Sequence, residues 1–225
     1  METYRTPRPK PHADTLSGFS LIELMLAMSL GIGLSGAILQ LLISESQLGL
    51  RVNRLLRERS VQQRTLALIR DDVVIASRIS ATPQLEQHAC SLAGRLPVLH
   101  LTTAAGVITY SVGTAPSGIW RGEVLMRCGP SFDLRGRPSY GAAPQNRVVI
   151  DGIAKTPDSR QACKFLLPST NSAASIDLAG SSQKGFCSCL EANMHSINIR
   201  ITQELKAPQG TPQLITSSTS ISRLT

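Results

Sequence analysis

Aromatic residues are scarce in this chain of 225 residues. They make up 4% of it and include a single tryptophan, Trp120. We expect Trp120 to lie in the core or in a sheet, not to form a platform for a ligand. Because 42% of the residues are hydrophobic, the chain can still bury a core of ordinary size.

The short patterns that carry enzyme chemistry are also missing. Ser117-Gly118 lacks the preceding glycine of a nucleophile elbow, the four histidines are scattered, and no glycine-rich loop matches a phosphate cradle. Asp71 and Asp72 form a carboxylate pair, but they lie near the end of a helical pattern, where we expect a solvated or interhelical role. The sequence therefore predicts no enzymatic activity and no cofactor.

Acidic residues are outnumbered by basic ones, 15 to 23, which gives a net charge of +8 at pH 7. A basic surface favours nucleic acid, anionic lipid or an acidic partner, and it does not decide between them. Many arginines fall between Arg51 and Arg78. They concentrate on a predicted helix. If that helix packs against other protein chains, its arginines are not available to DNA, so the basic charge is weaker evidence for DNA binding.

A long apolar run lies near the N-terminus. Residues 19–43 contain one charged side chain, Glu23, and are long enough to cross a bilayer as a helix. A carboxylate near the bilayer centre costs about 2.5 kcal/mol or more, and less near the interface. One interpretation is a signal-anchor helix whose acid reaches back to the headgroups. The other is that Glu23 has an assigned partner.

The flanking residues predict the orientation of this run. The segment before Gly18 holds three basic and two acidic residues, a small excess that places the N-terminus on the cytoplasmic side. A secretory signal would have an apolar region of about 7–15 residues with a small-residue cleavage site beyond it. Here the apolar run is longer, and the glycine precedes it.

The residues that follow Gly18 resemble the N-terminus of type IV prepilins and type II secretion pseudopilins. The stretch Gly-Phe-Ser-Leu-Ile-Glu-Leu-Met, which ends at Met25, is similar to that family's G-F-[ST]-L-[IL]-E-[LM] core. The resemblance implies that a prepilin peptidase cuts between Gly18 and Phe19 and methylates the new amino group of Phe19. It also implies that Glu23 neutralises the terminal amine of a neighbouring subunit, as a buried acid requires an opposite charge nearby.

Four segments are expected from these features. Residues 1–18 form the leader, 19–43 the transmembrane and assembly helix, 44–82 an amphipathic helix, and 83–225 an extracytoplasmic, β-rich domain. After cleavage 207 residues remain (225 minus 18), which suits one anchor helix and one globular domain.

An apolar stripe predicts the amphipathic helix. From Leu48 to Ala76, mostly apolar residues recur at alternating steps of four and three. Arg59 and Gln62 interrupt the stripe, and we expect them to face other subunits there. Pro83 is the expected stop, so the helix should continue to about Ser80.

Beyond Pro83 the pattern becomes extended. The predicted strands are residues 98–103, 107–112, 119–128, 147–150, 164–167, 197–202 and 213–222, with surface loops at 129–146 and 168–185. The fold class is therefore α+β, a long N-terminal helix packed on an antiparallel sheet. The resemblance implies the pilin fold.

Five cysteines follow the apolar run, on its extracytoplasmic side: Cys90, Cys128, Cys163, Cys187 and Cys189. Disulfides are expected there, and the odd count leaves one cysteine over. A one-residue loop disfavours a bond between the last two. We expect one of them to pair with Cys163, and the first two to pair together. A metal site is disfavoured because the Cys and His spacings do not repeat.

A second, looser resemblance concerns the domain. Residues 64–72, 107–112, 119–121 and 218–223 are similar to stretches of PilW-type minor pilins and J-type pseudopilins. This implies a minor subunit that helps initiate or cap a type IV pilus. The alternatives are a J-like pseudopilin of a type II secretion system and a DNA-uptake (competence) pilus subunit.

The resemblance also implies partners and a location. The expected partners are other pilin and minor pilin subunits, the prepilin peptidase, an inner-membrane assembly platform and, before assembly, membrane lipid. The competence alternative adds DNA as a partner. The expected location is the bacterial inner membrane, as a single-pass protein with a cytoplasmic N-terminus. From there the subunit would move into a pilus or pseudopilus filament.

Overall fold

The computed structural model describes residues 20–155, 163, 175–178, 185–191, 196–205 and 212–222. Gly18 and Phe19 therefore lie outside the described residues, and so do the leader and the strand predicted at 164–167. The chain divides into two compact units, residues 1–54 and 55–225, which are described separately below.

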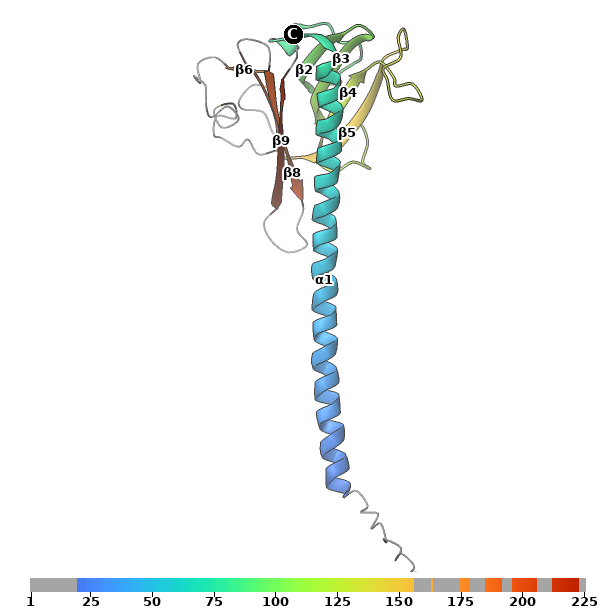
Figure 1. The fold of residues 1–225 in the computed structure, drawn as a ribbon, viewed down its shortest axis with the longest axis vertical. Helices are drawn as coiled ribbons and strands as arrows, with labels where there is room; N and C mark the ends of the chain where they lie inside the picture. Colours follow the sequence, from blue (N-terminus) through green and yellow to red (C-terminus); the bar gives the residue numbers. More distant parts are fainter. Residues whose placement is uncertain are drawn as a thin grey trace, which may run out of the picture. The chain divides into compact units, whose positions relative to one another are not determined.

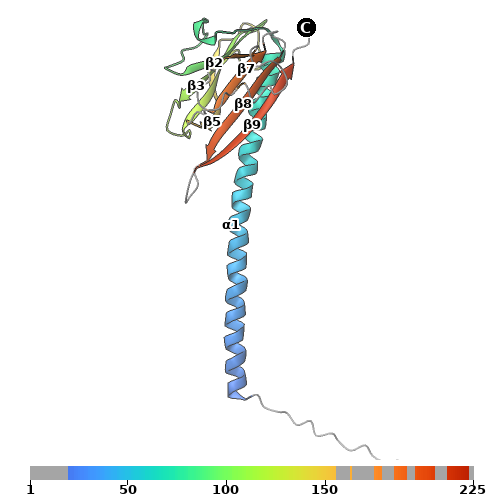
Figure 2. The same ribbon diagram turned by 90° about the vertical axis from the view of Figure 1, so that its left-hand side faces the viewer.

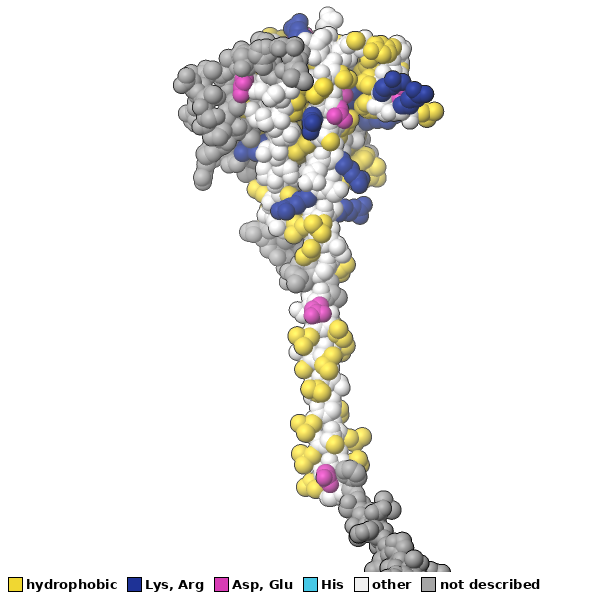
Figure 3. Space-filling model, viewed as in Figure 1, with side chains coloured by type: hydrophobic (Ala, Val, Ile, Leu, Met, Phe, Trp, Pro, Cys, Tyr) yellow, Lys and Arg dark blue, Asp and Glu magenta, His cyan; other side chains and the backbone are white. Residues whose placement is uncertain are grey.

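One long helix, α1, runs from Leu21–Val74 (Figure 1). In the first unit, its segment Leu21–Glu45 is long and apolar enough to cross a membrane by length and composition. Its side chains there are exposed, as a lipid-facing helix requires. Hydrophobic side chains follow this part of α1 on the face shown in Figure 3, with no Lys or Arg among them.

The second unit is an α+β domain. Its strands are β1 (Ala76–Ile79), β2 (Leu96–Thr103), β3 (Gly106–Thr114), β4 (Glu123–Gly129), β5 (Gln145–Ile153), β6 (Ser175–Asp177), β7 (Phe186–Glu191), β8 (Ser196–Leu205) and β9 (Gln213–Ser222). A short 3₁₀ helix, η1, covers Pro83–Leu85. The predicted strands at 98–103, 107–112, 147–150, 197–202 and 213–222 are thereby confirmed.

These strands form one antiparallel sheet that curls (Figures 1 and 2). Its order is β1-β2-β3-β4-β5-β8-β7-β6, and β9 pairs with the other edge of β8. The curl brings β7 against β2, where the Ser188 hydroxyl donates a hydrogen bond of 2.7 Å to the Val98 carbonyl. A sheet with its right-handed twist can close in this way around a helix.

The core lies between the last turns of α1 and the concave sheet. Leu66, Ile69 and Val73 of α1 are buried in one cluster with side chains of β2, β3, β7 and β8. They lie on the predicted apolar stripe, which is confirmed as the buried face over this part of the helix. Burying such a side chain stabilises the fold by about 1.5–3 kcal/mol.

The helix ends earlier than predicted, at Val74 and not near Ser80. Residues 76–79 instead form β1, which pairs with β2. The β-branched run Val73, Val74 and Ile75 favours extended structure over helix, and a free edge of β2 was available to pair. Pro83 opens η1 and does not stop α1.

The predicted strand at 119–128 begins only at Glu123. Trp120 lies in the preceding turn, 36% exposed, so its expected place in the core or sheet was wrong. Gly122, directly before β4, has a φ of +59°, a left-handed conformation that glycine adopts at little cost. The segment 168–185, which was predicted to be a loop, contains β6. Strand β7 was not predicted, because both of its faces are largely buried and its sequence therefore shows no alternation of polar and apolar residues.

Gly185 marks the place where β5, β7 and β8 meet. Its amide donates to the Ala154 carbonyl at 2.7 Å, and its carbonyl accepts from the Thr202 amide at 2.6 Å. A Cβ at this position would lie 2.2 Å from the Thr202 carbonyl oxygen. The close approach of three backbones therefore requires glycine here.

Candidate functional site

Glu23 lies in the first turn of α1, in the membrane-length span. Its amide donates to the Ser20 carbonyl at 3.0 Å, and its side chain is exposed. A carboxylate in the first turn stabilises a helix because it faces the positive end of the helix dipole. That local effect stabilises the carboxylate at the start of the helix. The helix end carries only a partial positive charge, so it does not neutralise the full negative charge of Glu23.

In the domain, Asp72 holds the centre of a buried polar network. Arg127 Nε donates to Asp72 Oδ2 at 2.6 Å and Nη2 to Oδ1 at 3.0 Å, while the Tyr110 hydroxyl donates to Oδ2 at 2.5 Å. All three residues are at most 5% exposed. The solvated or interhelical role expected for Asp72 was wrong, since its partners come from β3 and β4. Sequence spacing could not reveal them.

The electrostatics of this network follow from burial. Burial raises the pKa of the Tyr110 hydroxyl well above 10.0, and the neighbouring Asp72 charge raises it further. Burial opposes the charge on Arg127, but its hydrogen bonds to Asp72, the Asp72 charge and the Tyr110 hydroxyl together outweigh burial and raise the pKa of Arg127. Arg127 therefore stays protonated, and it also donates to the Pro130 carbonyl at 3.1 Å and lies over the Phe132 ring at 4.5 Å.

A second ion-pair group joins α1 to the β3–β4 turn and β5. Arg121 Nη1 donates to Glu58 Oε1 at 2.7 Å, and its Nη2 donates to Asp151 Oδ1 at 2.8 Å. The hydrogen bonds to Asp151, and then those to Glu58, raise the pKa of Arg121. Burial would raise the pKa of Asp151, but the hydrogen bonds from Arg121 and its positive charge together outweigh burial and lower the pKa.

Gln62 fixes α1 to β9. Its Nε2 donates to the Ile215 carbonyl at 2.9 Å, and its Oε1 accepts from the Ser217 hydroxyl at 2.6 Å. The side chain is fully buried. The expectation that Gln62 faces other subunits was therefore wrong, because an isolated polar residue in an apolar stripe can be satisfied by a strand that is distant in sequence. Arg59, its companion in that prediction, is exposed.

His88, which follows η1, and His100 of β2 both lie within hydrogen-bond distance of the Thr109 hydroxyl on β3. Thr109 Oγ1 lies 3.0 Å from His100 Nδ1 and 3.3 Å from His88 Nδ1. Burial lowers the pKa of His100, although the Glu86 carboxylate at 4.0 Å opposes this. A hydrogen bond from Ser80 lowers the pKa of Glu86.

The disulfides join Cys90 to Cys128 and Cys163 to Cys189, which matches the expected pairing. Cys187 takes part in neither; its Sγ accepts a hydrogen bond of 3.7 Å from Arg200 Nη2. The bonded sulfurs cannot act as thiolate ligands. Within the described segments, no three His, Cys, Asp or Glu side chains come close enough to hold a metal ion.

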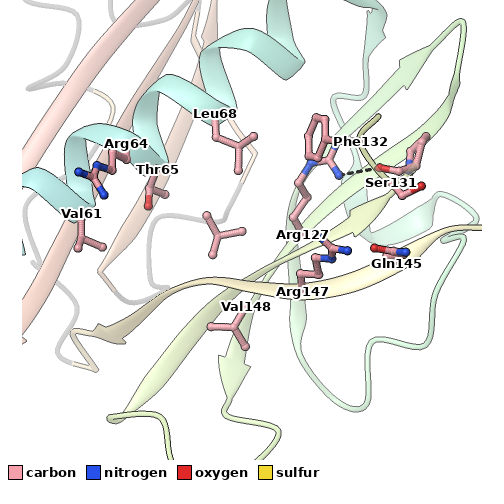
Figure 4. A pocket seen from close by; sticks show the side chains of 12 residues that line it. Val61, Arg64, Thr65, Leu68, Arg127, Ser131, Phe132, Gln145, Arg147 and Val148 are labelled. Atoms are coloured by element: carbon pink, nitrogen blue, oxygen red, sulfur yellow. Dashed lines mark hydrogen bonds between the residues drawn. The ribbon is translucent and has the colours of Figure 1, made fainter. Parts of the chain in front are cut away.

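A groove of about 420 Å³ separates one face of α1 from β4, β5 and the segment after β4. Figure 4 shows Arg64, Thr65 and Leu68 on the helix side, with Arg127 and Arg147 on the strand side. Valines supply much of the apolar lining: Val61, Val148 and Val149. Sequence reasoning missed this groove, because its two walls are far apart in the chain, the nearest lining residues being Leu68 and Arg127.

No family model, curated protein or solved structure matches the chain.

Proposed function

We propose that the chain is a minor pilin or pseudopilin, a structural subunit that helps initiate or cap a type IV pilus after processing by a prepilin peptidase. The observation that carries the proposal is the placement of Glu23. It is the one charged residue in the apolar run 19–43, and it follows Gly18 at the spacing of the prepilin motif.

The physics of that placement points to a partner charge. A carboxylate in the apolar region is costly in lipid, and it becomes tolerable beside an amine. Cleavage after Gly18 would create such an amine at Phe19. Incorporation into a filament would then bring the amine of one subunit to Glu23 of another, so the charge favours assembly over residence in the bilayer.

The architecture supports the same proposal. A membrane-length helix that continues into an α+β domain, with its later turns packed on an antiparallel sheet, is compatible with the pilin fold. The two disulfides suit a domain exported to an oxidising compartment. Polar links of Gln62 to β9 and of Arg121 to Glu58 also join the helix to the rest of the domain.

The test is incorporation of Glu23 variants in the native host. Glu23→Gln and Glu23→Ala should be cleaved after Gly18 like the wild type but should be largely lost from sheared filaments, because the charge partner is gone. Glu45→Gln, at the far end of the same span, is the matched control and should assemble normally. Normal incorporation of Glu23→Gln would sink the proposed charge pairing.

A type II secretion pseudopilin would undergo the same cleavage and assembly. Deleting the gene for this chain distinguishes the two, because the phenotypes differ. Loss of surface pili indicates the pilus assignment, and loss of protein secretion with pili intact indicates a J-like pseudopilin.

For the competence alternative, exposed arginines on α1 such as Arg57 and Arg70 are the relevant feature. Absence of salt-dependent DNA binding at low ionic strength would reject it.

A further inference from the structure

Among the described residues, the outer edge of β5 beside the groove has almost no partner strand. On its inner side β5 pairs with β4 along residues 145–150. On its outer side, the described pairing with β8 is confined to Ile153 and Gln203. No described strand therefore pairs with the outer edge of residues 145–150, which is about 20 Å of strand.

Natural sheets usually cover such an edge or blunt it with charge and proline. Here the segment is Gln-Asn-Arg-Val-Val-Ile, which has one charged residue, Arg147, and no proline. A register shift between Leu125 and Met126 leaves Val149 as an extra residue on β5. Because of this bulge, Val148 and Val149 both line the groove, although strict alternation would place them on opposite faces.

Charge on the two walls defines the chemistry of an occupant. Arg64 on α1 and Arg147 on β5 both line the groove and are exposed. Neither has a described carboxylate partner, whereas the third arginine of the groove, Arg127, is neutralised by Asp72. The groove thus offers an apolar floor with two available guanidinium groups above it.

We propose that β5 and this groove bind an extended acidic peptide segment of another protein by strand addition. The backbone of the segment pairs with the edge of β5 at residues 145–150. Its apolar side chains contact Val148 and Val149, and its carboxylates reach Arg64 and Arg147. Backbone hydrogen bonds supply affinity in this mode and the side-chain pockets supply specificity.

A single-stranded nucleic acid fits these walls less well. Such ligands are held by aromatic platforms on which successive bases stack, along a continuous basic track. The apolar lining of this groove is mostly aliphatic, and one face of Phe132, the aromatic residue that lines it, is covered by Arg127. The inference does not depend on the filament assignment, because it rests on the groove and strand of the second unit alone.

The probe is a peptide of about nine residues with alternating valine and glutamate and blocked ends, long enough to span the edge. The full chain in detergent micelles is titrated with the fluorescently labelled peptide. Binding is expected below about 1 mM, and the matching valine–lysine peptide should bind at least tenfold more weakly. Absence of binding at about 1 mM, or equal binding of both peptides, overturns the proposal.

Backbone methylation separates strand addition from capture by side chains. In an added strand, only alternate residues direct their N–H groups at the neighbouring strand. Two peptides, one N-methylated at every valine and the other at every glutamate, should therefore differ in affinity. One of them should not bind, and the other should keep the affinity of the parent peptide within about threefold. If both series bind like the parent peptide, strand addition is wrong.

Charge variants locate the site. The double variant R64E/R147E should weaken binding of the valine–glutamate peptide about tenfold or more. The control R70E/R135E changes net charge equally at exposed positions outside the groove and should change binding less than about twofold. Equal losses in the two variants, or tighter binding of an oligothymidylate than of the peptide, contradict the proposal.

Discussion

At the scale of single residues, the polar groups of the domain are partnered by strands that are distant in sequence. Asp72 is the clearest case, since its two oxygens accept from Arg127 and Tyr110. A buried pair of this kind adds little net stability compared with an apolar replacement. Removing one partner is costly, because an uncompensated charge stays behind.

Asp72→Asn should lower the free energy of unfolding by about 3–5 kcal/mol, because Arg127 keeps its charge in a buried site. Urea unfolding of the full chain in micelles, followed by Trp120 fluorescence, measures the change. Asp71→Asn is the matched control; this neighbour is exposed, so we expect a change within about 0.5 kcal/mol. Equal effects of the two variants would show that the network does not stabilise the domain.

His100 should make the domain sensitive to acid. Burial lowers its folded-state pKa below 6.5, so the unfolded chain binds the proton more readily than the folded one. The stability that neutral His100 contributes is present above pH 6.5 and is lost as pH falls through that value toward the folded-state pKa. The unfolding free energies of wild type and His100→Asn should therefore converge as pH falls from about 7 to about 5. A constant difference over that window would contradict this account.

At the scale of elements, the attachment of α1 to the sheet combines apolar and polar contacts. Leu66, Ile69 and Val73 bury one face of the helix, while Gln62 connects it to β9. The polar link sets the register of helix against strand, since a shift would leave the carbonyl and hydroxyl of β9 unpaired.

Gln62→Leu should destabilise the domain by about 1–3 kcal/mol, even though it adds apolar volume to an apolar stripe. The reason is that the Ile215 carbonyl and the Ser217 hydroxyl lose their partner. Gln63→Leu tests the adjacent exposed position and should change stability by less than about 0.5 kcal/mol. The same urea titration serves both, and a stabilised Gln62→Leu would refute the role assigned to Gln62.

The sequence predicted these elements where local pattern decides structure. Strands β2 and β3 and the stripe through Ile69 follow directly from periodicity. The end of α1 at Val74, the exposure of Trp120 and the partners of Asp72 could not be predicted in this way. Each depends on which distant strand lies nearby, and the groove at Arg64 and Arg147 depends on two walls that meet only in the fold.

At the scale of the whole molecule, each unit is built for a different setting. The first contains an apolar span, Leu21–Glu45, whose charged residues are Glu23 and, at its end, Glu45. The second is a disulfide-bonded α+β domain with a basic, open groove. Under the proposed function, the first unit moves from bilayer to filament and the second remains available to partners.

Processing at Gly18 is the step on which this account depends, because it creates the amine that Glu23 would pair with. The direct measurement is the mass and N-terminal sequence of the chain isolated from native membranes. We predict a chain of 207 residues (225 minus 18) that begins with N-methylated Phe19, and reduced processing in Gly18→Ala. A chain that keeps residues 1–18, or one cut beyond residue 43, would contradict the account.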